Sequence, residues 1–174
     1  MIKFKTTLKK SQLFIFFMLF GAMLAGCVDP LSRHHIALND EKGIDTRFDP
    51  KQKQLKLASD EPFVLFFYDT DCGACKAQIP DIEALSHEYA GRVKFIGILG
   101  GTQGFDKDMK LLKEHNVSFI TISDPVSVQY FDTAVGGVNG VPVTFIFNKN
   151  GEQAGKTLGY TPRAAINKKI LSVL

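Results

Sequence analysis

Two cysteines, Cys72 and Cys75, directly follow a short apolar run, and this arrangement constrains the fold more than any other feature of the 174-residue sequence. The run Phe63–Tyr68 is rich in valine and aromatic residues and lies between a proline and an aspartate, which predicts a buried strand. Residues 74–89 then carry apolar side chains at helical spacing. The cysteine pair is therefore expected at a strand-to-helix junction, with Cys72 close to the N-terminus of the helix.

A cysteine at the N-terminus of a helix is chemically activated. The thiolate is the reactive form, a free thiol has a pKa of about 8.5, and the unpaired N–H groups of a helix start favour the anion. We therefore expect Cys72 to be the nucleophile and Cys75, one turn on, to resolve a mixed disulfide. Two other interpretations stay open from the motif alone. One is half of a zinc site, although no second pair with ligand spacing follows, and the other is an inert structural disulfide.

Residues 1–26 have the pattern of a secretory signal. Four lysines precede the apolar stretch Leu13–Leu24, which is shorter than the ~20 residues that span a bilayer. The sequence Leu-Ala-Gly-Cys that ends at Cys27 resembles the lipobox of bacterial lipoproteins. The resemblance implies that Cys27 is acylated and that the chain is lipid-anchored in the bacterial cell envelope, facing the periplasm or extracytoplasmic space. An uncleaved signal anchor is the alternative interpretation.

The charge of the mature chain excludes one class of partner. Removal of residues 1–26 takes four of the 21 basic residues and none of the 18 acidic ones, so the mature chain is close to neutral and slightly acidic. A nucleic-acid-binding protein would carry a basic face, and no basic patch stands out here. With Cys27 acylated, Cys72 and Cys75 are the only thiols, in a compartment where disulfides persist.

The chain is expected to divide after Asp60. Residues 27–60 are polar and mixed, and we interpret them as a lipidated tether with one edge strand at Gln54–Leu57. The pair His34-His35 suggests a metal site, but no matching ligands lie nearby, so two solvated tether histidines are predicted. Residues 61–174 then form the folded domain.

Within that domain strands and helices alternate and end in a hairpin and a helix. Further strands are predicted at 92–99, 117–122, 141–147 and 153–158, and further helices at 105–115, 126–134 and 163–173. Local signals are a helix start at Asp124-Pro125, a turn at 148–151 and a cap at Thr161-Pro162. Pro80 is expected to kink its helix or to end the first turn. This order predicts an α/β fold, a mixed sheet flanked by helices on both faces.

These motifs together resemble the thioredoxin superfamily, and most of all the membrane-tethered TlpA/ResA type of thioredoxin-like lipoprotein. The resemblance runs from about Glu61 to the C-terminus and rests on the strand that leads into Cys72-Gly73-Ala74-Cys75, on Pro80, and on Gly-Val-Pro-Val-Thr-Phe at 140–145. It implies a thioredoxin-like fold, no cofactor and no metal. It also implies that Pro142 follows a cis peptide bond, and that Val141, Pro142, Gly73 and Ala74 contact an extended substrate.

Three positions depart from the family pattern. Asp71 stands where a tryptophan usually precedes the first cysteine, Phe66 where thioredoxin buries an acid, and Gln78 where the ResA type often has glutamate. An acid near the cysteines serves as proton acceptor or donor in exchange. Asp69 and Asp71 are the candidates to replace this acid, and water is the alternative proton carrier. If they have no such role, both are solvated loop carboxylates, and this interpretation is favoured for Asp69.

The same residues predict a reductant. Gly73-Ala74 offers no charge to a thiolate, and Asp71 disfavours one through like charge, which Lys76 offsets in part. The resemblance implies a disulfide-bearing protein substrate, such as apocytochrome c, and a membrane electron donor of the DsbD/CcdA type. Glycines at 100–101 and 136–140 are expected to flank the cysteines. Three alternative functions remain: an oxidase or isomerase, a peroxidase, and a lipoprotein with a structural disulfide. A peroxidase is disfavoured, because peroxiredoxins have threonine at the position of Asp69.

Overall fold

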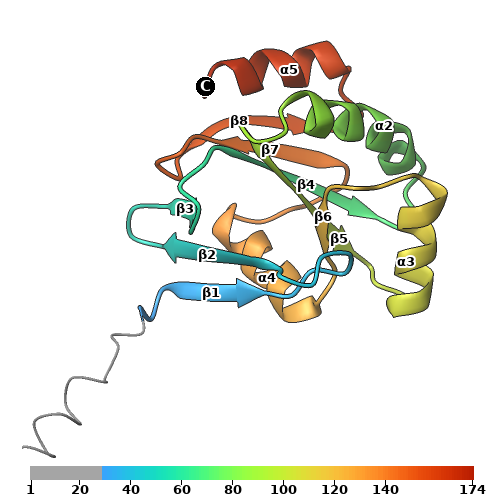
Figure 1. The fold of residues 1–174 in the computed structure, drawn as a ribbon, viewed down its shortest axis with the longest axis horizontal. Helices are drawn as coiled ribbons and strands as arrows, with labels where there is room; N and C mark the ends of the chain where they lie inside the picture. Colours follow the sequence, from blue (N-terminus) through green and yellow to red (C-terminus); the bar gives the residue numbers. More distant parts are fainter. Residues whose placement is uncertain (1–28) are drawn as a thin grey trace, which may run out of the picture. The chain divides into compact units, whose positions relative to one another are not determined.

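The computed structural model describes residues 29–174, and Leu31–Leu174 forms one compact unit (Figure 1). The predicted signal sequence at 1–26 and the lipidation site Cys27 lie outside the described residues. Within residues 29–174 no helix is both long and apolar enough to cross a bilayer.

The main sheet has five strands in the order β6-β5-β4-β7-β8 (Figure 1). The β4–β5 and β5–β6 pairs are parallel, and the β4–β7 and β7–β8 pairs are antiparallel, as predicted for a mixed sheet. The parallel strands are β4 (Phe63–Asp69), β5 (Lys94–Gly100) and β6 (Ile120–Ile122). The strands that pair antiparallel with their neighbours are β7 (Val143–Phe147) and β8 (Gln153–Leu158). Central strand β4 is buried on both faces over its first six residues, which explains its uninterrupted apolar sequence.

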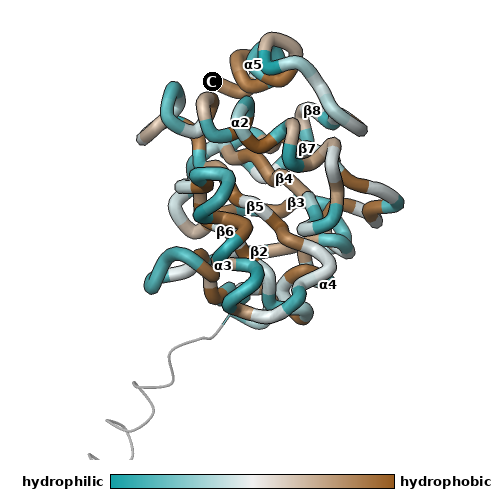
Figure 2. Tube along the Cα trace, turned by 90° about the vertical axis from the view of Figure 1, so that its right-hand side faces the viewer, coloured by the Kyte–Doolittle hydropathy of each residue, from teal (hydrophilic) through white to brown (hydrophobic). Residues whose placement is uncertain are grey.

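Helices cover both faces of this sheet, which confirms the predicted fold class. The helices are α2 (Gly73–Glu88), α3 (Phe105–Glu114), α4 (Pro125–Ala134) and α5 (Arg163–Leu171). Alternate side chains of β4 point to opposite faces. Val64, Phe66 and Tyr68 pack in a core cluster with side chains of α2, α3 and α5, while their neighbours pack with α4. Figure 2 shows hydrophobic residues concentrated along the central strands.

The expected tether at 27–60 is wrong for most of its length. From Ser32 the chain forms a second, antiparallel sheet of three strands, β1 (Ser32–His35), β2 (Ile44–Asp49) and β3 (Gln54–Leu57). Its apolar face joins the core cluster that contains α4. The predicted strand at Gln54–Leu57 is β3, whose two leucines are buried. The other two strands show only short alternations among charged residues, because they are buried on one face alone.

Residues 38–39 cover the edge strand β6. The backbone N–H of Leu38 donates to the carbonyl oxygen of Thr121 at 2.7 Å. The Asn39 side chain donates to the carbonyl oxygen of Phe119 and accepts from the N–H of Thr121, at 3.0 and 2.9 Å. These bonds satisfy polar groups that an open sheet edge would leave unpaired.

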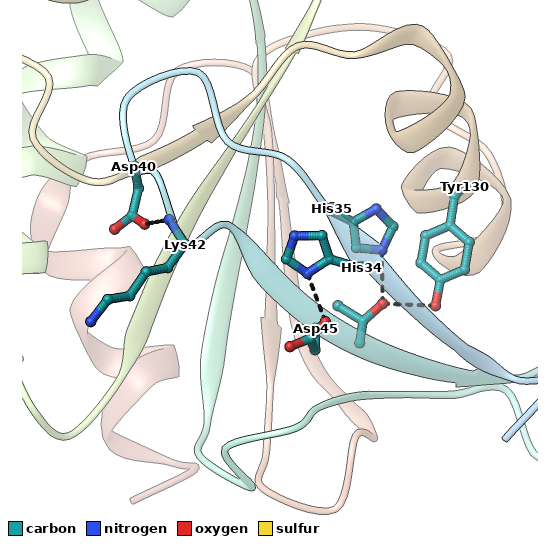
Figure 3. A network of polar contacts seen from close by, with 7 residues as sticks. His34, His35, Asp40, Lys42, Asp45 and Tyr130 are labelled. Atoms are coloured by element: carbon teal, nitrogen blue, oxygen red, sulfur yellow. Dashed lines mark hydrogen bonds and ion pairs between the residues drawn. The ribbon is translucent and has the colours of Figure 1, made fainter. Parts of the chain in front are cut away.

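The expectation of two solvated histidines holds for His34 and is wrong for His35. His34 is exposed and its Nδ1 lies 2.8 Å from Asp45 Oδ1. His35 is only 2% exposed, its Nε2 lies 2.9 Å from Thr46 Oγ1, and that hydroxyl donates to the Tyr130 hydroxyl of α4 at 2.9 Å (Figure 3). Burial lowers the pKa of His35 to about 4. Residues 29–174 contain no group of three or more potential metal ligands.

The local signals are mostly confirmed. Asp124 caps α4 by accepting the Ser127 N–H at 2.9 Å, with proline at the first helical position, and residues 148–151 close the β7–β8 hairpin. Helix α2 continues through Pro80, so the proline does not end the helix, and the kink stays a prediction. The expected cap of α5 is wrong in part, because Pro162 is the capping residue and no side chain bonds to the helix start.

Candidate redox site

The two cysteines lie where β4 ends at the carboxyl edge of the sheet. After Asp69 the chain turns, the backbone N–H of Cys72 contacts the carbonyl oxygen of Asp69 at 3.4 Å, and α2 begins at Gly73. Cys72 is the N-cap residue and has extended backbone angles. The carboxyl ends of strands in open α/β sheets are where such proteins place their sites.

Cys72 and Cys75 are joined by a disulfide, with their Cα atoms 5.1 Å apart. Cys75 is fully buried, whereas Cys72 is partly exposed, in agreement with the expected outer and inner positions. The backbone N–H of Cys75 donates to Cys72 Sγ at 3.1 Å. Sulfur thus takes the position that an N-cap oxygen usually holds, and an anionic sulfur there would receive both this bond and the helix dipole.

The loop that precedes β7 lies beside the disulfide. The peptide bond between Val141 and Pro142 is cis, as the resemblance implied. The carbonyl oxygen of Val141 lies 3.7 Å from Cys72 Sγ, and the Val141 side chain is 37% exposed. Pro142 itself is buried, and its carbonyl oxygen accepts the N–H of Gly159 at 2.8 Å. This geometry brings Val141 to the reactive sulfur; its role toward a substrate stays a prediction.

Gly73 and Ala74 form the exposed first turn of α2 between the cysteines. A Cβ atom added to Gly73 would meet no atom within 4 Å. This turn therefore leaves the approach to Cys72 free of larger side chains on the helix side. Substrate contact by the two residues stays a prediction as well.

The two candidate proton carriers differ in setting. Asp69 is half-buried, its Oδ1 accepts the backbone N–H of Asp71 at 3.1 Å, and it packs against the loop after β5. A Cβ atom at Gly101, where φ is +58°, would lie 2.3 Å from Asp69 Oδ2. The favoured interpretation of Asp69 as a solvated loop carboxylate is therefore wrong, because Asp69 ends β4 and bonds to the backbone of residues 70–72, here called the redox loop. Asp71 is exposed.

Neither family position for a buried acid holds a carboxylate. Phe66 is buried and stacks on Tyr68, with ring centroids 5.0 Å apart. Gln78 lies one turn after Cys75 and is 1% exposed; its Oε1 accepts the Thr161 N–H at 2.7 Å. Its Nε2 is buried and has no hydrogen-bond partner within the described part of the chain.

Sequence reasoning missed a group of polar residues at the loop after β5. Asp108 of α3 is fully buried and accepts from the Thr102 hydroxyl and, at 3.1 Å, from the backbone N–H of Gln103. The Gln103 side chain donates to Asp71 Oδ2 at 2.9 Å and lies 3.3 Å from Thr70 Oγ1. Two reasons explain why no sign of this group was visible in the sequence. An aspartate in the first turn of a helix, such as Asp108, indicates only a helix cap. The contact of Gln103 with Asp71 requires β4 and β5 to be neighbours.

A cleft of about 410 Å³ opens at the same edge of the sheet. Gly100 and Gly101 line it, as does Val138 from the predicted glycine-rich loop, whereas neither cysteine does. Its other lining residues are Phe67, Leu99, Thr102, Ser123, Pro125, Val128, Gln129 and Asp132. The loop after β5 therefore lines this cleft, and the disulfide does not.

Comparisons with known proteins place this geometry in a family. The Redoxin family model matches residues 38–170. Thioredoxin M-type of Pisum sativum is 24% identical over 143 residues, which cover 80% of this chain and 67% of that protein. Thioredoxin C-2 of Corynebacterium nephridii is 26% identical over 110 residues, covering 63% and 77%.

Solved structures show the same fold. A thiol:disulfide interchange protein of the thioredoxin family from Chlorobium tepidum has a TM-score of 0.64 at 18% identity, over 85% of this chain and 99% of that one. StoA from Bacillus subtilis has a TM-score of 0.60 at 15% identity, over 81% and 97%. The chain therefore belongs to the Redoxin family and is a thioredoxin-like thiol–disulfide oxidoreductase.

Proposed function

We propose that this oxidoreductase is a membrane-tethered reductant that opens disulfides of extracytoplasmic proteins through Cys72 and Cys75. The observation that carries the proposal is the setting of Cys72 Sγ, which accepts the Cys75 N–H at 3.1 Å and lies 3.7 Å from the Val141 carbonyl oxygen. A sulfur with one fixed donor and an open side is suited to attack an incoming disulfide.

The exchange proceeds in two displacements. The Cys72 thiolate attacks one substrate sulfur, the substrate S–S bond breaks, and the released substrate thiolate takes up a proton. Cys75 loses its proton, and its thiolate attacks Cys72 Sγ, which forms the Cys72–Cys75 disulfide and releases the second substrate thiolate. Two electrons pass from the protein to the substrate.

Positioning of the substrate falls to the loop before β7. A substrate chain that lies extended along Val141 and Pro142 brings its sulfur to Cys72, because the Val141 carbonyl already contacts Cys72 Sγ. Gly73 and Ala74 present no bulky side chain on the other side. Disulfide-bearing proteins, apocytochrome c among them, are the proposed substrates.

The direction of exchange follows from charge. A strong oxidant stabilises its reduced thiolate, usually with a positive charge near the sulfur. Here the residues between the cysteines are Gly73 and Ala74, and the preceding side chain is the carboxylate of Asp71. These features favour the disulfide form of the protein and hence reduction of the substrate.

A reductant outside the cytoplasm has to be recharged. We propose a membrane dithiol donor of the DsbD/CcdA type, which reduces the Cys72–Cys75 disulfide by the reverse exchange. Lipid attachment at Cys27, outside the described residues, holds the protein at the membrane. A similar fold belongs to a secreted Mycobacterium tuberculosis disulfide oxidoreductase, which supports an extracytoplasmic location.

The test is the reduction potential of residues 28–174, equilibrated with dithiothreitol or glutathione buffers. A value near or below that of thioredoxin, about −270 mV, supports a reductant, and a value near about −120 mV, as for DsbA, reverses the direction to an oxidase. Cys75→Ser should trap a mixed disulfide with a protein substrate, and Cys72→Ser is the matched control that should trap none. A protein that exchanges with neither buffer has a structural disulfide.

A further inference from the structure

We infer that Gln103 is a positioning residue of the redox site, which sets the thiolate character of Cys72 by holding the carboxylate of Asp71. The inference rests on the proposed role of Cys72 as the exchanging cysteine. It concerns a residue of the loop after β5, 31 positions away in sequence from Cys72, whose side chain bonds to Thr70 and Asp71.

A buried carboxylate of α3 fixes the backbone of this loop. Asp108 is 0% exposed and accepts the Thr102 hydroxyl and the Gln103 N–H. The N–H of Asp108 in turn donates to the carbonyl oxygen of Gly104 at 3.0 Å. A buried carboxylate without partners is costly, and these donors satisfy it. The loop therefore holds Gln103 in one place at the edge of the sheet.

From this position the side chain of Gln103 reaches the redox loop. Its Nε2 donates to Asp71 Oδ2 at 2.9 Å and to Thr70 Oγ1 at 3.3 Å. These are the two residues directly before Cys72. The backbone N–H of Asp71 is bonded as well, to Asp69 Oδ1 at 3.1 Å. Asp71 is therefore held at both its backbone and its carboxylate, and the carboxylate is directed to the loop after β5.

This placement matters because Asp71 is the charge next to the reactive sulfur. A nearby negative charge disfavours a thiolate, and a donor on that carboxylate stabilises its charge and fixes its direction. Cys72 Sγ is fixed by other contacts, namely the Cys75 N–H and the Val141 carbonyl oxygen. Without Gln103 the carboxylate is free to turn toward the sulfur, and the Cys72 thiolate loses stability.

The exposure of Gln103 sets its proposed role apart from a role in folding alone. The side chain of Gln103 is exposed, so its loss costs the fold little. A purely structural side chain would leave the acidity of Cys72 unchanged. The decisive readout is thus the pKa of the Cys72 thiol, together with the thiol–disulfide equilibrium constant.

We would measure thiolate absorbance against pH, and the equilibrium with dithiothreitol above the Cys72 pKa, for residues 28–174. Gln103→Ala should lower the ratio of thiolate to thiol about threefold at a given pH. It should shift the equilibrium toward the protein disulfide by the same factor, ~14 mV at 29.6 mV per tenfold change. Gln103→Lys keeps a donor and adds a positive charge, so it should shift both in the opposite direction. Gln52→Ala, an exposed glutamine on the β2–β3 turn, is the control that should change neither.

The double-mutant cycle with Asp71→Asn isolates the pathway. Asp71→Asn should raise the thiolate fraction, and Gln103→Ala should add no shift in that background. Two results would overturn the inference and leave the proposed function intact. One is a Gln103→Ala protein whose Cys72 pKa equals that of wild type. The other is a Gln103→Ala shift of the Cys72 pKa that is undiminished when Asp71→Asn is also present. A wild-type protein that exchanges with no thiol buffer would overturn both.

Discussion

The buried histidine His35 makes the stability of this protein depend on pH. Its imidazole lies at the junction of β1, β2 and α4, near the Tyr130 ring (Figure 3). The ring centroids of Tyr130 and Phe131 are 4.7 and 4.6 Å from that of His35. Thr46 uses its only hydroxyl proton toward Tyr130, so His35 Nε2–H donates to Thr46 Oγ1. Nδ1 is buried without a hydrogen-bond partner in the described chain. A second proton would therefore create a buried cation with one unpaired donor.

The sign and size follow from the pKa. Burial is the main cause that lowers the pKa of His35 from 6.5 to about 4, and the charge of His34 acts in the same direction. Asp124 and Asp45 oppose the shift and Arg33 adds to it, each less than burial does. The unfolded chain binds this proton more readily than the folded one. The contribution of neutral His35 to the free energy of unfolding is therefore fully present above pH 6.5. It decreases by about 3 kcal/mol as the pH falls to 4, at 1.36 kcal/mol per pH unit.

The assay is urea unfolding, followed by circular dichroism between pH 7 and pH 4 with the disulfide intact. The comparison is with His35→Gln, which cannot titrate, and the matched control is His34→Gln on the exposed neighbour. Carboxylates contribute equally to all three proteins, so the difference between wild type and His35→Gln isolates the histidine. That difference should shrink by about 3 kcal/mol as the pH falls. His34→Gln removes only the second cause of the His35 shift and keeps the burial, so it should lose most of the same stability. Parallel curves for wild type and His35→Gln would refute this reasoning.

Three further predictions concern stability, each measured as the free energy of unfolding. Asn39→Ala removes both side-chain bonds to β6 and should cost about 2 kcal/mol, whereas Asn139→Ala, on an exposed loop, should cost little. Gly97→Ala should cost about 1–3 kcal/mol, because its Cβ would lie 2.7 and 2.8 Å from the rings of Phe119 and Tyr68; the open site Gly140→Ala should not. Gln78→Glu buries a carboxyl whose pKa should rise, so its cost relative to Gln52→Glu should be large at pH 7 and diminish toward pH 4.5.

The sequence predicted the part of the fold whose signals are local. The apolar run Phe63–Tyr68 and the helix after it needed no tertiary information, because a strand buried on both faces is apolar throughout. Cys72 at the helix start and Cys75 beneath it follow from the same junction. The cis bond before Pro142 came from the family resemblance alone, since no residue pattern distinguishes it from a trans bond.

The remainder depends on contacts between distant segments. Ile44, Leu55 and Leu57 become core residues only because the second sheet packs in the cluster that contains α4, so their surroundings in sequence suggested a tether. His35 next to exposed His34 has no local mark of burial. The contact of Gln103 with Asp71 exists because β5 follows β4 in the sheet, a register that polar residues in two separate loops do not reveal.

The cover over β6 has a consequence for how this chain acquires its structure. Asn39 bonds to residues 80 and 82 positions later, and Thr46 to one 84 positions later. The first three strands are thus synthesised well before the residues that they dock on. Contacts of such long sequence separation slow folding, and until they form, the edge of β6 is open to pairing with another chain. The N-terminal sheet is therefore expected to close last, and the interval before it closes is when a newly made chain most needs protection from aggregation.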